Sequence, residues 1–211
     1  MENESLKTLK EIKSLMEKST RFISLSGISG ISAGIVALIG CFILFLNYSE
    51  FIFAIPSYYK EIPENDNRFN SFLLFIWIDA ILMLVFAIGS AIFFTTLRAK
   101  KNKQAIWDHT VKNLLINMFI PLAPGGIFCL ILFFQHQFYL IPAVSILFYG
   151  LALINAGKYT LNEIKYLGLS EIIIGLFASI FWEYGFIFWA FGFGIMHIIY
   201  GSIMYFKYEK A

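Results

Sequence analysis

The chain has 211 residues, of which 59% are hydrophobic and 14% are charged, and its mean hydropathy is +0.73. A soluble domain of this length cannot bury so much apolar surface, so the composition excludes an ordinary soluble fold and indicates a membrane protein. The formal net charge is only +2, and no basic tract interleaved with aromatic residues indicates nucleic-acid binding.

Residues 1–20 form the first predicted element, a cytoplasmic amphipathic helix. Leu6, Leu9, Ile12 and Met16 recur at intervals of three and four residues, and most positions between them are charged or polar. Three interpretations of this apolar stripe are open. It lies on the inner membrane surface, it packs against the ends of the transmembrane helices, or it pairs with a helix of a partner protein or of a second copy. A cytoplasmic protein partner that binds through residues 1–20 is thus one expectation, and a homo-oligomer is another.

The remaining domain, residues 21–211, is predicted to be an all-α bundle of six transmembrane helices, with the lipid bilayer as its solvent. Each apolar stretch is close to the ~20 residues that cross a ~30 Å hydrocarbon core as a helix. Continuous apolar runs of this length indicate helices, because a helix satisfies its own backbone hydrogen bonds in lipid. The stretches are about residues 22–46, 70–97, 111–134, 138–157, 166–183 and 185–206.

The distribution of Lys and Arg between these stretches predicts the orientation of the chain. If the chain crosses six times, 14 of the 16 basic residues lie on one side, and only Lys60 and Arg68 lie on the other. The positive-inside rule then places both termini in the cytoplasm. The basic residues of the predicted cytoplasmic side are Lys7, Lys10, Lys13, Lys18, Arg21, Arg98, Lys100, Lys101, Lys103, Lys112, Lys158, Lys165, Lys207 and Lys210.

The first predicted span contains a ridge of small residues. Ser26, Gly30 and Gly34 follow one another at four-residue spacing, so they lie on one face of the helix. Ridges of this kind let two transmembrane helices approach closely. We expect the ridge to pack against another helix of the same bundle, and homodimerisation through the ridge is the alternative.

The third predicted span contains two prolines and two glycines near its middle. Pro121 and Pro124 lack the backbone donor and collide with the preceding turn, and Gly125 and Gly126 tolerate non-helical backbone angles. The sequence therefore predicts a helix break or a strong kink here. Broken helices at the bilayer midplane form the binding sites of many transporters, although kinks without a transported substrate are also common.

Ionisable and amide side chains inside the predicted spans are candidate functional residues, because they are costly in hydrocarbon. Asn117, Asn155 and Glu171 are expected toward the inner face, and His197 near the middle of the sixth span. If the third to sixth spans pack together, these four residues form an intramembrane polar cluster in which Glu171 and His197 exchange a proton. The alternative is that they are structural residues whose hydrogen bonds hold the helices together.

Other sequence signals for chemistry are weak. Asp79 and Glu183 are expected toward the outer face, and Cys41 and Cys129 are expected to be small packing residues. The chain has no His-Glu-x-x-His motif for zinc and no Gly-x-x-x-x-Gly-Lys motif for nucleotide phosphates. We therefore assign no catalytic residue, and we expect no metal and no cofactor.

Short strings near both ends of the chain carry a family resemblance. Residues 11–27 read EIKSLMEKSTRFISLSG, residues 197–201 read HIIYG and residues 204–208 read MYFKY. These strings resemble a group of bacterial six-span integral inner-membrane proteins to which no activity is assigned. The likeness covers the two ends, whereas the middle is similar in hydropathy alone. The resemblance implies a six-span inner-membrane fold, and it implies no activity and no site residue.

From these patterns we predict a non-enzymatic integral membrane protein that binds a partner or acts as a regulator, with residues 1–20 as its docking surface. The second hypothesis is a small permease or proton-coupled carrier, which uses the broken third span together with Glu171 and His197. An intramembrane enzyme is the third hypothesis, because no reactive group of residues is recognisable in the sequence.

Overall fold

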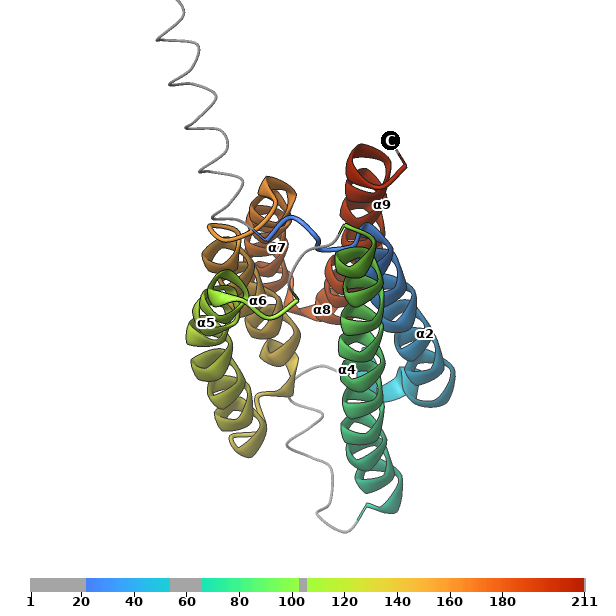
Figure 1. Ribbon diagram of the computed structural model, residues 1–211. Helices are drawn as coiled ribbons and strands as arrows, with labels where there is room; N and C mark the ends of the chain where they lie inside the picture. The colour runs from blue at the N-terminus through green and yellow to red at the C-terminus, as the bar shows by residue number, and fades with distance from the viewer. Residues whose placement is uncertain (1–21, 54–65, 103–105, 211) are drawn as a thin grey trace, which may run out of the picture.

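The computed structural model describes residues 22–53, 66–102 and 106–210, and within these ranges every regular element is helical (Figure 1). The predicted helix 1–20 and most of the segment between the first two spans lie outside the described residues. The longer α-helices are α2 (Gly27–Ile52), α4 (Asn67–Lys101), α5 (His109–Phe134), α6 (Ile141–Ala156), α7 (Asn162–Ile180) and α9 (His197–Tyr208). The shorter elements are η1 (Phe138–Leu140), η2 (Trp182–Tyr184), α8 (Gly185–Trp189) and the π-helix η3 (Ala190–Met196).

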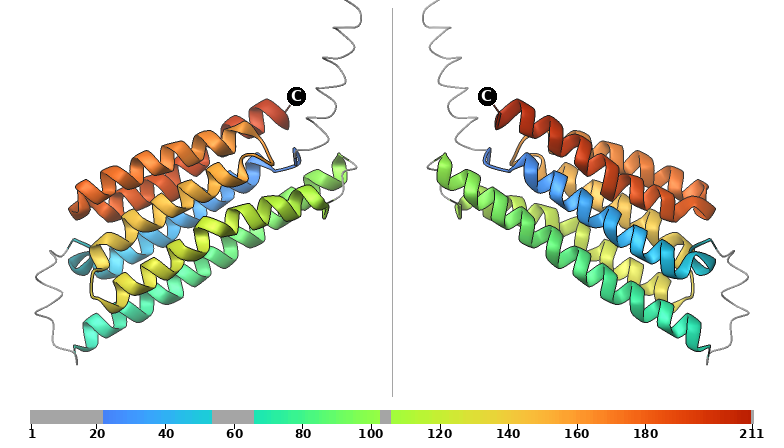
Figure 2. Two further views of the ribbon diagram at one scale, coloured as in Figure 1. Left: turned by 90° about the vertical axis from the view of Figure 1, so that its left-hand side faces the viewer. Right: turned by 90° about the vertical axis from the view of Figure 1, so that its right-hand side faces the viewer.

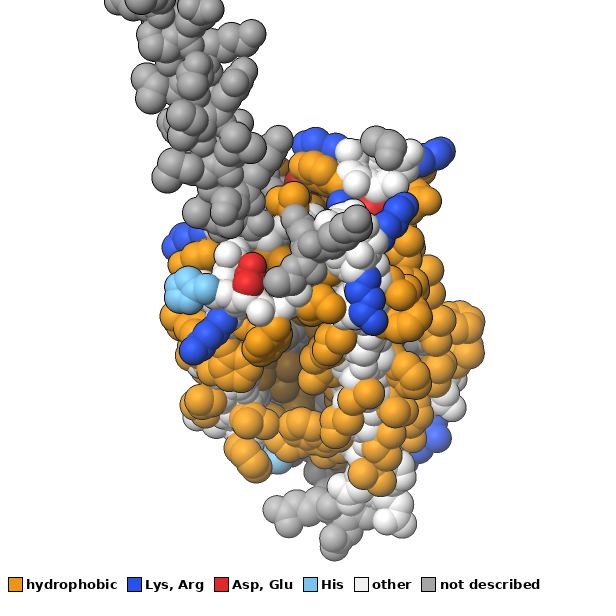
Figure 3. All heavy atoms as spheres, in the orientation of Figure 1, with side chains coloured by type: hydrophobic (Ala, Val, Ile, Leu, Met, Phe, Trp, Pro, Cys, Tyr) orange, Lys and Arg blue, Asp and Glu red, His pale blue; other side chains and the backbone are white. Residues whose placement is uncertain are grey.

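Five helical stretches of the described chain are long and apolar enough to cross a membrane, which is the architecture of a multi-pass membrane protein. Many of their large apolar side chains are exposed, as expected where lipid rather than protein surrounds a helix (Figure 3). Six spans were predicted, and α7 is the stretch that differs: it has 19 residues but carries Glu163, Lys165 and Glu171. The five stretches are Gly27–Ile52, Asn67–Lys101, His109–Phe134, Phe138–Ala156 and Trp182–Tyr208.

Basic residues gather at one end of the bundle, which we call the inner end; the opposite end is the outer end. The inner end carries the starts of α2, α5 and α7 and the ends of α4, α6 and α9 (Figure 1). Of the nine Lys and Arg residues in the described ranges, eight lie near the inner end and only Arg68 lies near the outer end. The eight are Arg98, Lys100, Lys101, Lys112, Lys158, Lys165, Lys207 and Lys210.

The first helix begins at Gly27 rather than near residue 22, and residues 22–26 form an extended strap across the inner end. Phe22 N donates a hydrogen bond to Tyr159 O at 2.8 Å, and Thr160 Oγ1 donates to Phe22 O at 2.7 Å. The strap therefore runs from α2 to the turn between α6 and α7. These hydrogen bonds satisfy backbone groups of the strap, so this part of the strap does not need to be helical.

At the outer end α2 continues to Ile52, beyond its predicted end. Tyr48 has non-helical backbone angles (φ −143°, ψ 32°), so the last turn of α2 bends away from the helix axis. The bend brings Phe51 into a cluster with Phe69 and Phe72 of α4, and the rings of Phe51 and Phe72 stack with centroids 4.9 Å apart. Burial of these rings stabilises the bent last turn of α2 against α4.

The helices pack as two groups that run side by side (Figures 1 and 2). In one group α2 packs against α4, η3 and α9, and in the other α6 packs against α5 and α7. The final helical stretch joins the groups, because α8 contacts α6 and α7 whereas α9 contacts α2. The π-helix η3 lies where this stretch passes from one group to the other.

The glycines of the small-residue ridge on α2 face the last helices of the same chain. A Cβ on Gly30 would lie 3.1 Å from Gly201 Cα, and a Cβ on Gly34 would lie 2.5 Å from Gly194 O. Larger residues would therefore push the two backbones apart, and glycine permits their close approach. The two glycines are covered within one chain.

Ser26, the first residue of the ridge, is the N-cap residue of α2 and bonds to the segment after α9. Its Oγ donates to the Glu209 carboxylate at 3.2 Å, and Gly27 N donates to the same carboxylate. Arg98 at the end of α4 lies 3.4 Å from Glu209 and donates to Leu25 O. A negative charge at a helix N-terminus is stabilising, so Glu209 ties the ends of three helices together.

Of the predicted break or strong kink in the third span, the break is wrong, because α5 is helical without interruption through Pro121 and Pro124. A proline at 121 cannot donate to the carbonyl oxygen of Asn117, four residues earlier. In the structure Asn155 Nδ2 of α6 donates to Asn117 O at 3.0 Å and takes the place of the lost backbone donor. A neighbouring helix thus satisfies the backbone that the proline leaves unpaired.

The two glycines of the predicted break do not use their conformational freedom, since no glycine in the described ranges has a positive φ. A side chain on Gly125 would collide with Phe148 of α6, so glycine here lets α5 and α6 pack closely. By contrast, nothing lies within 4 Å of the position that a Cβ on Gly126 would take.

Candidate functional site

Glu171 lies near the middle of α7, nine residues or ~14 Å from the helix start. It is 0% exposed, and neither of its carboxylate oxygens has a hydrogen-bond partner among the described residues. One turn earlier, α7 contacts α6 so closely that a Cβ on either Gly150 or Gly168 would lie 2.7 Å from the other's carbonyl oxygen. A buried carboxylate without partners is costly, so its presence requires an explanation.

His197, the first residue of α9, lies beside Glu171 and is itself buried. Its Nδ1 lies 3.6 Å from Glu171 Oε1 and 3.0 Å from Gly192 O, and its Nε2 lies 2.8 Å from the hydroxyl of Tyr149 in α6. A carbonyl oxygen only accepts hydrogen bonds, so Nδ1 donates to Gly192, and the neutral ring accepts from Tyr149 at Nε2. The imidazole therefore joins a hydroxyl on one side to a carboxylate on the other.

The π-helix η3 shapes the space that the Glu171 carboxylate occupies. A Cβ on Gly192, within η3, would lie 2.5 Å from Glu171 Oε2, so a larger residue would displace the carboxylate. The same residue supplies the carbonyl oxygen that binds His197 five residues later. Short π-helical segments inside α-helices are frequent at functional sites, because they redirect backbone groups that a regular helix would use.

Aromatic rings continue from His197 toward the outer end. The ring of Tyr149 stacks on His197 with centroids 5.4 Å apart, and Phe193 lies 4.9 Å from Tyr149. Trp189 follows, with its centroid 4.7 Å from that of Phe193. The rings of Tyr149, Phe193 and Trp189, which we call the aromatic column, fill the space on the outer side of Glu171 and His197.

A cavity of about 400 Å³ begins at Trp189, and we call it the outer cavity. Its walls come from α2, α4, α5, α6 and α8 together with η1 and η2, so it lies between the two helix groups. Figure 3 shows the surface hollowed between α5 and α4. Asp79 of α4 lines this cavity, is 9% exposed, and makes no hydrogen bond or ion pair with the part of the chain that the structure describes.

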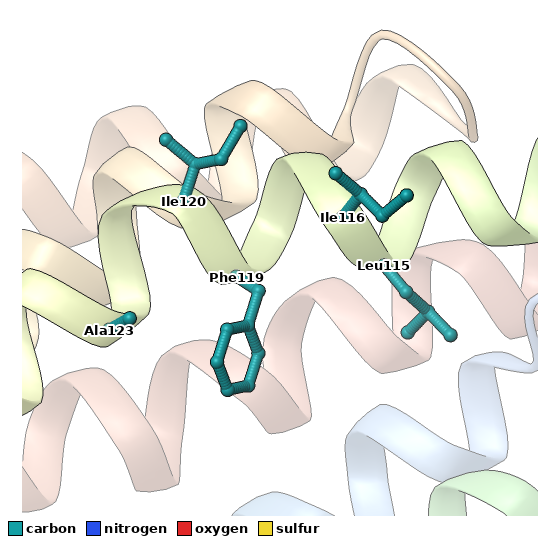
Figure 4. Close-up of a pocket in the computed structure, with 5 residues that line it drawn as sticks. All are labelled: Leu115, Ile116, Phe119, Ile120 and Ala123. Atoms are coloured by element: carbon teal, nitrogen blue, oxygen red, sulfur yellow. The ribbon is translucent and has the colours of Figure 1, made fainter.

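A second hollow lies on the surface of α5 and is entirely apolar (Figure 4). Figure 4 shows Leu115 and Phe119 pointing to one side of α5 and Ile116 and Ile120 to the other. All of its lining residues come from this one helix, and none carries a polar side chain. It is therefore part of the apolar surface of the bundle and offers no group for chemistry.

The four residues of the predicted polar cluster divide into two pairs. Glu171 and His197 lie together, as described above. Asn155 bonds instead to Asn117 O on α5 and accepts from Lys158 Nζ at 2.9 Å. This second pair has the structural role that was the alternative prediction, whereas the Glu171–His197 pair carries an unsatisfied group that helix packing does not explain.

Two residues of the site were missed by sequence reasoning. Tyr149 lies in the middle of the fourth predicted span, where its hydroxyl needs a partner, and this was the available signal. Gly192 gave no signal, because its importance comes from the π-helical backbone and from a carboxylate on another helix.

The arrangement can bind and transfer a proton. A single proton on Glu171 neutralises the buried carboxylate, whereas the same proton on His197 leaves Glu171 ionised and makes the two residues an ion pair. The His197 ring could pass a proton between the Tyr149 side and the Glu171 side, because each nitrogen contacts one of them. In the described ranges no group of three His, Cys, Asp or Glu residues could hold a metal ion.

Comparison with known proteins adds no further assignment. No protein-family model, no curated protein and no solved structure matches this chain.

Proposed function

We propose that the chain is a six-span protein of a bacterial inner membrane, with both termini in the cytoplasm, and that it acts as a small proton-coupled carrier. The single observation that carries the proposed activity is Glu171: a wholly buried carboxylate without hydrogen-bond partners, 3.6 Å from a buried histidine, halfway along its helix. Ionisable residues at this depth mark proton and substrate pathways in membrane proteins.

The length of α7 supports a sixth crossing. Its 19 residues extend ~28 Å, close to the ~30 Å of a hydrocarbon core. Glu163 lies in its first turn at the inner end and accepts from Lys207 Nζ at 2.6 Å, and Lys165 lies close by. Only Glu171 is deep, and it faces His197 rather than lipid. The gathering of basic residues at the inner end favours a cytoplasmic location for that end.

The burial of Glu171 favours proton binding as its activity. Burying an isolated carboxylate anion in an apolar interior is far more costly than burying the acid, so the residue must be neutralised by a proton or by a charged partner. His197 can supply the second option when it is protonated. In both options the pair holds one proton and is neutral overall, so its net charge changes when that proton leaves. Coupling of that change to a bound solute is the basis of proton-driven transport.

The aromatic column provides a physical link between the proton site and a solute site. Trp189 lines the outer cavity, and its ring contacts Phe193, which in turn contacts Tyr149. Movement of His197 on protonation would therefore be transmitted through packed rings to the cavity wall. This connection favours a carrier over an isolated structural glutamate.

Infrared spectroscopy of the protein in liposomes tests the proton site directly. We expect a carbonyl-stretching band of a protonated carboxylic acid to appear and disappear as the pH is changed, and we expect Glu171→Gln to remove it. Glu50→Gln is the matched control. The Glu50 side chain is 46% exposed, and it lies at the outer end of α2 rather than at the site. A pH-dependent carbonyl band of the same position and amplitude in Glu171→Gln as in the wild type would refute the assignment.

A second measurement asks whether the site moves protons across the membrane. In proteoliposomes with an imposed pH gradient, His197→Phe and Glu171→Gln should abolish solute-dependent proton movement that the wild type and Glu50→Gln retain. Equal proton movement in all four proteins would show that the pair is structural.

The partner-binding role predicted for residues 1–20 stays a prediction, because these residues lie outside the described ranges. The described strap fixes the point from which residues 1–20 would extend, because Phe22 is bound at the inner end by Tyr159 and Thr160. Deletion of residues 2–18 should remove a co-purifying partner without preventing membrane insertion if this role is correct.

A further inference from the structure

The described walls of the outer cavity are mostly apolar, and the charged residues among them are all acidic. Among its described lining residues only Asp79 and Glu183 carry a charge, both are acidic, and no Lys, Arg or His is present. Most of the other lining residues are aliphatic or aromatic. Of the described Lys and Arg residues, only Arg68 lies near the outer end, and it is paired with Glu50 at 2.9 Å. The described cavity walls thus offer an apolar surface with an excess of negative charge.

Asp79 is the residue that distinguishes this cavity from a simple gap between helices. Its side chain lies against α2, where a Cβ on Gly40 would be 3.2 Å from Asp79 Oδ1. It is more than nine-tenths buried, and it makes no hydrogen bond or ion pair with the described residues. A lipid acyl chain could fill the apolar volume, but it would leave this carboxylate without a partner.

Aromatic side chains surround the volume that faces Asp79. Trp182 and Tyr139 meet at the outer end with ring centroids 5.4 Å apart, and Trp189 lies at the deep end. The faces of tryptophan and tyrosine rings attract organic cations, and they also accept apolar groups. The volume of about 400 Å³ is within the range of sites that hold small organic molecules.

We propose that the outer cavity binds a small amphipathic organic cation, with Asp79 facing the positive charge and Trp182 and Trp189 contacting the apolar body. The ligand enters from the side, through the hollow between α4 and α5 (Figure 3). Binding of the cation stands on the cavity alone. The further step, exchange of this cation for a proton held by Glu171 and His197, rests on the proposed function.

Two isosteric probes test the charge requirement on the unmodified protein. Benzyltrimethylammonium and neopentylbenzene have the same shape, because a carbon atom in the second replaces the charged nitrogen of the first. Equilibrium dialysis against the full-length protein in nanodiscs of uncharged lipid, corrected with empty nanodiscs, measures both affinities. We expect the cation to bind at least about tenfold more tightly than the uncharged probe. Equal binding of both probes, or no binding of the cation, would overturn the proposal.

Variants of Asp79 then locate the negative charge. Asp79→Asn should weaken cation binding by about tenfold without changing the affinity for the uncharged probe, and Asp79→Glu, which keeps the charge, should restore most of the binding. Far-UV circular dichroism establishes that both variants are folded, and Glu50→Gln is the control for an outer-end carboxylate that is not in the cavity. Unchanged cation binding in folded Asp79→Asn would overturn the assignment.

Two separate measurements on the wild type, cation binding and the titration of Glu171, separate this proposal from the proposed function. Glu171 does not line the outer cavity, so each measurement reports on its own site. If the cation binds and no proton titrates at Glu171, the carrier proposal fails and the cation site stands. If Glu171 titrates and the cation does not bind, the cation site fails and the proton site stands.

Discussion

Replacement of Gly168 by alanine is predicted to destabilise the bundle, because it adds a methyl group between two helix backbones. A Cβ at this position would lie 2.7 Å from Gly150 O and 2.9 Å from Ile154 N, and both of these are backbone atoms. A flexible side chain could move away from the new methyl group, but a helix backbone cannot do so alone. The two helices would have to separate by roughly 0.7 Å to reach the 3.4 Å at which ordinary contact begins.

The size of the effect follows from two opposing terms. Overpacking of a well-packed interior costs about 1–3 kcal/mol, and exchange of glycine for alanine inside a helix regains about 0.5–1 kcal/mol. Taken at the middle of both ranges, the free energy of unfolding should therefore fall by about 1.2 kcal/mol, which is roughly an eightfold change in the unfolding equilibrium constant. Gly89 and Gly126 are matched controls, because nothing lies within 4 Å of a Cβ at either position.

Reversible unfolding in mixed detergent micelles, followed by circular dichroism as the fraction of denaturing detergent rises, measures these differences. The alanine variants at Gly89 and Gly126 should be as stable as the wild type or slightly more stable. A Gly168→Ala protein as stable as these controls would refute the claim that α6 and α7 are in backbone contact.

Two further predictions use the same unfolding assay. Asn155→Leu should lower the free energy of unfolding by about 1–3 kcal/mol, because it leaves the carbonyl oxygen of Asn117 unpaired. Pro121→Ala should reduce this loss by restoring the backbone donor. Equal losses with proline or alanine at position 121 would disprove the compensation. The Arg98 side chain is 9% exposed, so Arg98→Gln should destabilise the protein by about 1–3 kcal/mol. The Arg68 side chain is 62% exposed, so Arg68→Gln should change stability by less than about 1 kcal/mol. Equal effects of the two substitutions would contradict the difference in burial.

Hydropathy and charge identify the helices of this chain well, because the cost of apolar surface in water and of backbone polar groups in lipid depends on local sequence. Helix ends are less predictable. The apolar run that begins at Phe22 indicates a helix, yet residues 22–26 are extended because Tyr159 and Thr160, far along the chain, bind this segment. Such contacts leave no signal in the sequence of the segment itself.

The same limit applies to the candidate site and to the third span. Pro121 predicts a helix break from local rules, and Asn155 on a neighbouring helix removes the reason for it. Glu171 and His197 could be predicted as candidate residues, because ionisable side chains are costly in hydrocarbon. That they form one pair, and Asn117 and Asn155 another, could not be predicted, because it depends on which faces of α6 contact α5 and α7. The π-helix, which admits the Glu171 carboxylate beside Gly192, has no known sequence pattern on which a prediction could rest.

The contact between the first and last helices has a consequence for how the protein is made. The ribosome produces α2 first, and the partners of its glycine ridge, Gly194 and Gly201, are made more than a hundred residues later. At ~5–20 residues per second this delay is roughly ten to thirty seconds. During that time α2 can pack against α4, but its ridge is uncovered, and the carboxylate of Glu209 has not yet reached its N-terminus. Synthesis of η3 and α9 is therefore the step that covers the ridge, and a newly inserted α2 needs lipid or an insertion factor to occupy the face that α9 will cover.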